Sequence, residues 1–539
     1  MSIRKPPSPR ADRTRPAALV LAAAFVVCAT SAVHAGEAGA PPDLDRYVAK
    51  AMRAFGAPGL SLAIVQDGRT VIAKGYGVRS IATRDPVTPD TAFPIGSETK
   101  AFTSAALAIL VDEGRLRWSD RIADKLRGFR MYDPYATEHM TVRDLLTHRS
   151  GLGLGEGDLL ITPNTTRSRA DIVHALRYLK PRTGFREVFA YDNILYIVAG
   201  QLVQSVSGET WEHFVEHHIF APLGMMNSRT LYDPAAPNAV ALHGRIDGSI
   251  RGMGKERILT DVFASEASAP CGAINASAVD MAKWMAMWEE GGKLPDGRIL
   301  LSAAAVRELR DPVVVVPSDA FDAVSPLLAG PALQDYALGW FVEDDYGHTV
   351  VEHMGAVFGA QAALYFIPDR GVAFSVMINS EDGGARRAVV DYLLAHYLGQ
   401  PRQDWVGELA AVDRDIIGKT LSVMKNLPRR YEPNDRVSLR MPAYAGAYSD
   451  PWYGPMTVSV RPGNHLWINF IRTPKMDGPL EHIADDTFRA HWTDRGIEDA
   501  YLSFEIAGGR IRSIAMRPVS PLADFSFDYQ DLHFRPVGG

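Results

Sequence analysis

The stretch Phe-Pro-Ile-Gly-Ser-Glu-Thr-Lys at residues 93–100 decides the fold that this sequence predicts. Ser97 follows a turn and opens an apolar run that ends at Gly114, which predicts a helix over residues 97–113. Because apolar residues lie around most of its surface, this helix is expected in the interior of a large domain. Lys100 comes three residues after Ser97, so both side chains share one face of the helix.

Ser97 and Lys100 form a candidate pair of nucleophile and base. A serine hydroxyl is a weak nucleophile until a neighbouring group takes its proton. Burial lowers the pKa of a lysine, so Lys100 can serve as that base. Ser97 also lies at a helix N-terminus, where free N–H groups favour a developing oxyanion. Spacing alone is a weak signal, since Ser422 and Lys425 repeat it in a polar helix beside a linker.

Two later segments add candidate site residues. Tyr191 and Asn193 stand between a turn and a predicted helix. A lysine cation within reach would favour tyrosinate, which makes Tyr191 a candidate base, and the Asn193 amide is suited to hold a substrate amide. His353, Gly355 and Ala356 follow a predicted strand. Gly355 would let a substrate backbone approach closely, and the N–H of Ala356 is a candidate second oxyanion donor.

The rest of the chain predicts an α+β domain followed by a small all-β domain. Strand patterns flank a helical middle, which favours an antiparallel sheet built from both ends of the domain. Short strands at even spacing then predict a barrel or a sandwich. The expected parts are a signal peptide at residues 1–35, a first domain at 42–399, a helical linker at 400–442 and a β domain at 443–539.

Six segments in this order resemble the serine β-lactamase and penicillin-binding-protein family, in its class C-like branch with D-aminopeptidase and esterase relatives. The segments are residues 93–100, 145–152, 191–193, 222–225, 336–340 and 353–355. The resemblance implies a β-lactamase/transpeptidase-like domain, with an antiparallel sheet flanked by helices and a helical subdomain. Residues 444–448 and 453–458 resemble the barrel-like domain that follows many such hydrolases.

The same resemblance implies roles for the candidate residues. Ser97 would be the nucleophile, Lys100 the activating lysine, Tyr191 the general base and acid, and Asn193 a substrate-amide ligand. His353 stands where many β-lactamases carry lysine. Because a neutral imidazole binds a substrate carboxylate less strongly than an ammonium, this departure puts β-lactam hydrolysis in doubt.

The expected activity is therefore hydrolysis through an acyl-enzyme. Substrates would be esters, D-amino-acid peptides or amides, and less readily β-lactams. The alternative is a non-catalytic sensor of the penicillin-binding type that keeps the pocket. Activity with an acyl donor separates the two.

The N-terminus predicts export. Five basic residues precede an apolar run at 17–33, and residues 33–35 have the small-x-small shape of a cleavage site. We expect cleavage after Ala35, a periplasmic or secreted protein, and no stable membrane insertion afterwards. An uncleaved anchor is the alternative, although an apolar run of about 17 residues is at the short limit for spanning a bilayer.

The sequence predicts neither a metal nor a cofactor. Cleavage would remove Cys28 and leave Cys271 alone, expected to be a small buried residue, which excludes a disulfide and a Cys-based zinc site. His213 and His217 match an inverted zinc-protease motif, but they lie in a helix that this family uses for packing. With a net charge of −6, the expected partner is a small-molecule or peptide substrate rather than nucleic acid.

Overall fold

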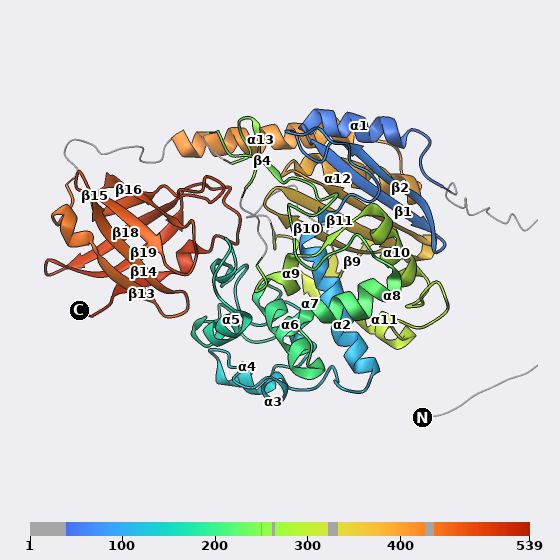
Figure 1. The fold of residues 1–539 in the computed structure, drawn as a ribbon, viewed down its shortest axis with the longest axis horizontal. Coiled ribbons are helices and arrows are strands. Elements are labelled where there is room, and N and C mark those ends of the chain that lie inside the picture. The colour runs from blue at the N-terminus through green and yellow to red at the C-terminus, as the bar shows by residue number, and fades with distance from the viewer. Residues whose placement is uncertain (1–38, 249–250, 261–264, 322–332, 426–435, 539) are drawn as a thin grey trace, which may run out of the picture. The chain divides into compact units, whose positions relative to one another are not determined.

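The computed structural model describes residues 39–248, 251–260, 265–321, 333–425 and 436–538 (Figure 1). All of them belong to one compact unit. The expected signal peptide and residues 426–435 of the expected linker lie outside the described residues. Within the described ranges, no helix combines the length and the apolar character needed to cross a bilayer.

The centre of the first domain is an antiparallel sheet of eight strands in the order β2-β1-β12-β11-β10-β9-β8-β7. The prediction that both ends of the domain form one sheet is confirmed, since β1 pairs with β12. Every residue of β12 is buried, as in a strand covered on both faces. The strands are β1 Gly59–Gln66, β2 Arg69–Gly77, β7 Val314–Val316, β8 Gln334–Tyr336, β9 Phe341–Asp345, β10 His348–Val357, β11 Ala360–Ile367 and β12 Val372–Ile378.

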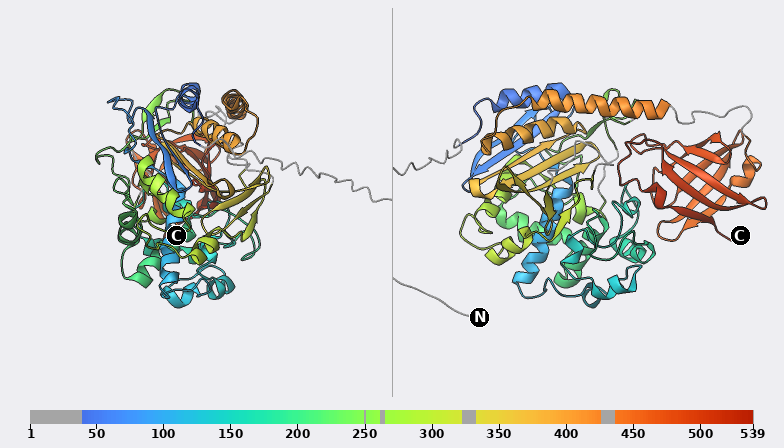
Figure 2. Two further views of the ribbon diagram at one scale, coloured as in Figure 1. Left: turned by 90° about the vertical axis from the view of Figure 1, so that its right-hand side faces the viewer. Right: turned by 180° about the vertical axis from the view of Figure 1, so that it is seen from behind.

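Helices cover both faces of this sheet (Figures 1 and 2). Leu62 and Ile64 of β1 pack with α1 and α12 on one face, while Ala63 and Val65 pack with α2 and α10 on the other. This alternation is the period of two of a strand. The covering helices are α1 Leu44–Phe55, α2 Thr99–Asp112, α10 Ala278–Glu289 and α12 Gly383–Tyr397, and α13 Trp405–Lys425 packs against α1 and α12.

The predicted helix over residues 97–113 starts differently from the expectation. Residues Gly96–Glu98 form a 3₁₀ turn, and α2 begins at Thr99. Ser97 therefore lies in the turn before the helix, and Lys100 lies in its first turn. The other helices are α3 Ile122–Lys125, α4 Pro134–His139, α5 Arg169–Ala175, α6 Ile194–Ser207, α7 Trp211–Val215, α8 Ala221–Leu223, α9 Ala269–Gly272 and α11 Ala303–Arg310.

Two small sheets join distant segments. Strand β3 (Phe93–Pro94), directly before the Ser97 turn, pairs with β6 (Asn275–Ala276). Strands β4 (His243–Arg245) and β5 (Glu256–Ile258) pair with each other. The first pair ties the turn of Ser97 to the segment that contains α9.

The C-terminal domain is a closed barrel of eight strands, β13 to β20 in sequence order. The prediction of a small barrel-like domain is confirmed. Strands β13, β16 and β20 were not predicted, because their short or interrupted apolar patterns resemble turns. The strands are β13 Gly446–Asp450, β14 Gly454–Arg461, β15 His465–Phe470, β16 Asp477–Ala484, β17 Thr487–Ala490, β18 Ala500–Ala507, β19 Arg510–Pro518 and β20 His533–Pro536.

Candidate active site

Ser97, Lys100 and Tyr191 converge on one point. The Nζ of Lys100 lies 2.9 Å from the Oγ of Ser97, and Tyr191 is hydrogen-bonded to the same hydroxyl. Lys100 also lies 4.8 Å from the centroid of the Tyr191 ring. Ser97 is partly exposed, while the other two side chains are buried. The structure thus brings together the three residues predicted to carry the chemistry.

Lys100 is fully buried among three oxygen acceptors. Besides Ser97, its Nζ donates to the Oδ1 of Asn193 at 2.7 Å and to the carbonyl oxygen of Cys271 at 2.9 Å. Burial lowers the pKa of Lys100 to about 8, although the negative charges of Asp158 and Asp192 oppose the shift. An amine with this pKa is largely protonated at neutral pH but loses its proton easily.

The phenol of Tyr191 stays protonated. Burial raises the pKa of Tyr191 well above its usual value, and the hydrogen bond from Ser97 opposes this only in part. The His148 ring packs at 4.2 Å between centroids, and its Nδ1 accepts from the backbone N–H of Asp192. Its raised pKa disfavours the tyrosinate expected from the sequence, whereas Lys100, with its lowered pKa, reaches its basic form at a lower pH.

Asn193 links Lys100 to a second buried carboxyl group. Its Oδ1 accepts from Lys100, and its Nδ2 donates to the Oδ2 of Asp158 at 2.7 Å. One hydrogen of the amide nitrogen is committed to Asp158. The predicted contact with a substrate amide would use the second hydrogen, and it stays a prediction.

Strand β10 packs tightly against the Ser97 turn. A Cβ atom at Gly355 would overlap the carbonyl oxygen of Ile95, and one at Gly96 would collide with the backbone nitrogen of Ala356. Gly355 was expected to admit a substrate backbone, but the backbone that approaches it is that of the turn itself. The backbone nitrogens of Ser97 and Ala356 therefore lie close to each other.

His353 is turned into the protein. Its Nδ1 bonds to the carbonyl oxygen of Met354 at 2.7 Å, and its Nε2 lies 3.2 Å from the hydroxyl of Tyr336. Burial and the charge of Lys100 lower the pKa of His353 to about 3, so the ring is neutral. A substrate carboxylate would have to displace Tyr336 to reach this ring.

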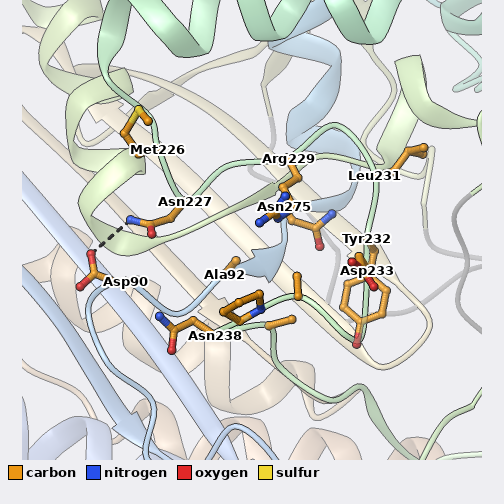
Figure 3. A pocket seen from close by; sticks show the side chains of 13 residues that line it. Asp90, Ala92, Met226, Asn227, Arg229, Leu231, Tyr232, Asp233, Asn238 and Asn275 are labelled. Atoms are coloured by element: carbon orange, nitrogen blue, oxygen red, sulfur yellow. Dashed lines mark hydrogen bonds between the residues drawn. The ribbon is translucent and has the colours of Figure 1, made fainter.

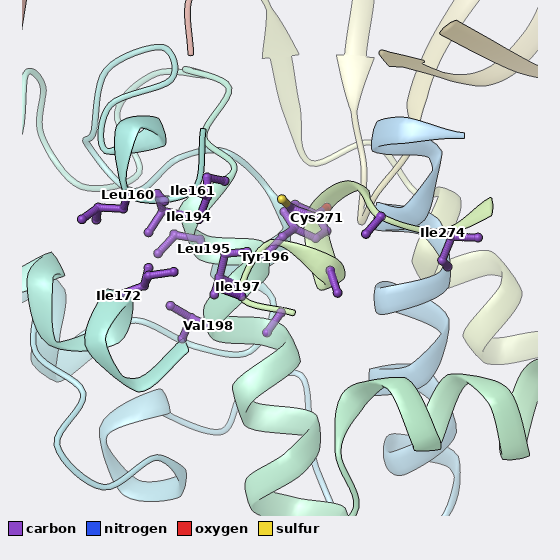
Figure 4. Packing of buried hydrophobic residues seen from close by; sticks show 14 of the residues in the cluster. Leu160, Ile161, Ile172, Ile194, Leu195, Tyr196, Ile197, Val198, Cys271 and Ile274 are labelled. Carbon is purple, nitrogen blue, oxygen red and sulfur yellow. The ribbon is translucent and has the colours of Figure 1, made fainter. Parts of the chain in front are cut away.

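An apolar cluster that includes residues of α6 and α9 lies next to the site (Figure 4). Cys271 is buried, as expected, and burial raises the pKa of its thiol to about 11. Its carbonyl oxygen is presented to Lys100 by α9. Gly200 of α6 permits this, because a Cβ there would overlap the ring of Pro270. The labelled members are Leu160, Ile161, Ile172, Ile194, Leu195, Tyr196, Ile197, Val198, Cys271 and Ile274.

Sequence reasoning missed two buried carboxyl groups at the site. Asp192 accepts from the hydroxyl of Ser150 at 2.8 Å and from the N–H of Leu195 at 3.2 Å, and burial raises its pKa to about 6. Its place two residues before α6, where its carboxylate can accept from the first turn, is a signal that was available. Asp158 lies in a Gly-rich loop, and no local signal identifies it.

A cavity of about 140 Å³ lies away from these residues (Figure 3). Asp90, Arg229, Asp233 and Asn275 are among the residues that line it, and none of the predicted site residues does. The cavity combines carboxylates with a guanidinium and an amide. Because none of the predicted site residues lines it, the cavity is separate from the Ser97 site.

The histidines of the zinc-like motif do not form a metal cluster. The rings of His213 and His217 stack with centroids 3.9 Å apart, and Nδ1 of His213 lies 2.7 Å from the carboxylate of Glu209. In the part of the chain that the structure describes, no group of three or more His, Cys, Asp or Glu side chains is placed to hold a metal ion.

Both parts of the chain match known protein families. The model of the Beta-lactamase family matches residues 44–399, and that of a domain of unknown function, DUF3471, matches residues 432–536. An unguisins hydrolase (ungD) of Aspergillus violaceofuscus is 27% identical over 77% of this chain and 76% of its own length. Penicillin-binding protein 4 of Amycolatopsis lactamdurans is 28% identical over 64% of this chain and 85% of its own length.

Solved structures share the fold. The octameric penicillin-binding protein homologue from Pyrococcus abyssi superimposes with a TM-score of 0.55 at 21% identity. The match covers 91% of this chain and 99% of that one. Both the first domain and the C-terminal part of the chain therefore have counterparts in known folds.

Proposed function

The chain belongs to the beta-lactamase family, and on that premise we propose that it is a serine hydrolase that forms an acyl-enzyme at Ser97. The observation that carries the proposal is the 2.9 Å contact between the Nζ of Lys100 and the Oγ of Ser97. The relatives named as hydrolases agree with it.

The three acceptors of Lys100 explain how it can take a proton. An ammonium has three N–H donors, and Ser97, Asn193 and Cys271 use all of them. A neutral amine has two N–H donors and one lone pair. If Asn193 and the carbonyl of Cys271 keep the two donors, the lone pair points at Ser97 and can accept the proton of its hydroxyl.

Acylation then follows with balanced proton transfers. The Oγ of Ser97 bonds to the substrate carbonyl carbon while its proton passes to Lys100, and the N–H groups of Ser97 and Ala356 stabilise the oxyanion. The bond to the leaving group breaks as the phenol of Tyr191 donates its proton, which Lys100 restores. In deacylation a water attacks the carbonyl carbon of the acyl ester. Tyr191 and Lys100 pass the proton of the water to the Oγ of Ser97, and the acid product leaves.

The surroundings of Tyr191 support substrates with an apolar acyl group. Leu154, Phe321 and Phe525 are partly buried side chains that pack against the cluster containing Tyr191. Esters and D-amino-acid peptides or amides fit this surface. β-Lactams fit it less well, because the position expected to hold their carboxylate carries the neutral, internally bonded His353.

Labelling and turnover test the proposal together. We expect a fluorophosphonate to add to the peptide that contains Ser97, and an activated ester with an apolar acyl group to be hydrolysed repeatedly. A panel of ester, D-amide and β-lactam substrates then ranks the acyl donors. Labelling without turnover of any donor would favour the non-catalytic sensor, and a folded protein that is not labelled would refute the nucleophile.

The proposal includes export to the periplasm or the medium. It is supported by the basic and apolar composition of residues 1–35. The protein recovered from a bacterial host should begin at residue 36. Recovery of the full-length chain in the membrane fraction would favour the anchor instead.

A further inference from the structure

Asp158 is a buried carboxyl group that the proposed reaction does not use. It opens a 3₁₀ turn, Asp158–Leu160, and it is fully buried. Its Oδ2 accepts two hydrogen bonds, from the Nδ2 of Asn193 at 2.7 Å and from the hydroxyl of Ser526 at 2.8 Å. The second donor belongs to the C-terminal domain, between the last two strands of the barrel.

Asp158 sets the orientation of the Asn193 amide. Because the Nδ2 of Asn193 needs an acceptor, it faces Asp158, and the Oδ1 consequently faces Lys100. The reverse orientation would point an N–H donor at the lysine and leave Lys100 without one of its acceptors. The carboxyl group therefore controls the hydrogen bond that directs the amine of Lys100 toward Ser97.

The C-terminal domain also fixes the backbone on both sides of Asp158. The two oxygens of Asp528 accept from the N–H of Gly157 at 2.7 Å and from the N–H of Leu159 at 2.9 Å. The ring of Phe525 lies so close to Gly155 that a Cβ there would collide with it. Three residues of the C-terminal domain thus hold the loop of Asp158. Ser526 bonds to its carboxylate, Asp528 bonds to the loop backbone, and the ring of Phe525 packs on Gly155.

We propose that Asp158 is a positioning residue for Lys100, and that Ser526 and Asp528 of the C-terminal domain hold Asp158 in place. The inference deepens the proposed function and rests on it. In this arrangement the catalytic domain supplies the reacting groups, while the barrel domain completes the hydrogen-bond chain from Ser526 through Asp158 and Asn193 to Lys100. The barrel is then part of the active site rather than a separate module.

The charged groups around Lys100 and Asp158 decide how the pKa of Lys100 should change in variants of this hydrogen-bond chain. Lys100 faces the carboxyl groups of Asp158 and Asp192, the rings of Tyr191 and Tyr196, the Cys271 segment and the neutral His148 and His353. Asp158 also faces Asp524 and Asp528. Burial raises the pKa of Asp158 to about 7, and its charge in turn raises the pKa of Lys100. Removing that charge lowers the pKa of Lys100.

Three variants of the full chain separate positioning from general stability. Asp158→Asn keeps an oxygen for Asn193 and Ser526 but has no charge. Ser526→Ala removes the donor from the C-terminal domain, and Ser526→Thr retains a hydroxyl. Ser520→Ala is the matched control, since Ser520 is a buried serine of the same domain whose hydroxyl accepts from the N–H of Leu522 at 3.1 Å.

Two measurements are made on each variant. The first is the rate at which a fluorophosphonate labels Ser97 as a function of pH. The second is the titration of Lys100, followed by the ¹³Cε chemical shift of labelled lysine and assigned with Lys100→Arg. The second measurement reports on Lys100 even if the protein has no hydrolase activity.

We expect Ser526→Ala to slow labelling about 3- to 10-fold, as for the loss of one hydrogen bond, and Ser526→Thr to recover most of that loss. Asp158→Asn should move the midpoint of the Lys100 titration down by about 0.5–1 pH unit. Ser520→Ala should match the wild-type protein in both measurements.

The outcomes distinguish this inference from the proposed function. Wild-type labelling and Lys100 titration in both Asp158→Asn and Ser526→Ala would overturn the positioning role, and so would an equal loss in Ser520→Ala. A wild-type protein that resists labelling, together with a lowered Lys100 midpoint in Asp158→Asn, would refute the hydrolase and uphold the link between Asp158 and Lys100.

Discussion

Two described segments place a serine three residues before a lysine, and their surroundings differ completely. Lys100 is fully buried and bonds to Ser97 and two further acceptors. Ser422 and Lys425, near the end of α13, are exposed to solvent. The shared spacing brings each pair to one face of a helix. Burial lowers the pKa of Lys100, and acceptors from distant segments hold its amine beside Ser97. The two segments therefore differ through tertiary structure and not through the pattern.

The largest expected effect comes from deleting the hydroxyl of Ser97, and deletion of the Ser422 hydroxyl is its control. Ser97→Ala should reduce kcat/KM for an activated ester by at least about 10³-fold, because it removes the proposed nucleophile. Ser422→Ala should leave kcat/KM unchanged. Thermal unfolding of both variants shows whether they remain folded. Turnover retained in Ser97→Ala would place the nucleophile elsewhere, and an equal loss in Ser422→Ala would remove the distinction between the two segments.

The pH dependence of acylation gives a smaller and graded effect. Only neutral Lys100 can accept the proton of Ser97, so the labelling rate should rise about tenfold per pH unit below the pKa of Lys100, about 8, and level off above it. Tyr191 contributes no step in this range, since burial keeps its phenol protonated. A rate that is flat between pH 6 and 9 would contradict the role of Lys100 as the base.

The same contrast explains what the sequence could predict. Ser97 and Lys100 were found because their contact is local, and Tyr191 was found because it stands beside a helix start. The carbonyl of Cys271 and the carboxyl of Asp158 were missed, because each acts across many residues and leaves no local pattern. Ser526 is the extreme case: 368 residues separate it from its partner Asp158.

The fold follows the same rule. Helix α1, Leu44–Phe55, lies on a stretch whose amphipathic spacing and following glycine predict a helix from the sequence alone. Strands β7 and β8, of three residues each, were missed because so short an element has no periodicity to detect. The sequence predicts that α2 starts at Ser97, but the helix begins at Thr99. Residues Gly96–Glu98 form a 3₁₀ turn against which β10 packs closely. These short strands and the start of α2 depend on tertiary packing, which the local sequence pattern does not reveal.

The smallest expected effect is on stability, and it sharpens the comparison of the two lysines. The pKa of Lys100 is lowered from 10.5 to about 8, so the folded state releases a proton that the unfolded state still binds between these values. The stability lost by burying the ammonium is therefore largest below about pH 8 and fades as the pH rises toward 10.5. Lys100→Met removes that cost, and we expect it to raise the free energy of unfolding at pH 7 by about 1–3 kcal/mol.

Lys425→Met is the matched control, since an exposed lysine pays no desolvation cost, and its unfolding free energy should change by less than about 0.5 kcal/mol. Urea denaturation of both variants at pH 7 and pH 10 measures the difference. The gain in Lys100→Met should shrink at the higher pH, where the wild-type lysine is neutral. A gain of equal size at both pH values would mean that improved packing, and not the buried charge, stabilises the variant. A loss at pH 7 would mean that the three acceptors of Lys100 outweigh its desolvation, so that the site would no longer be a place where stability is given up for reactivity.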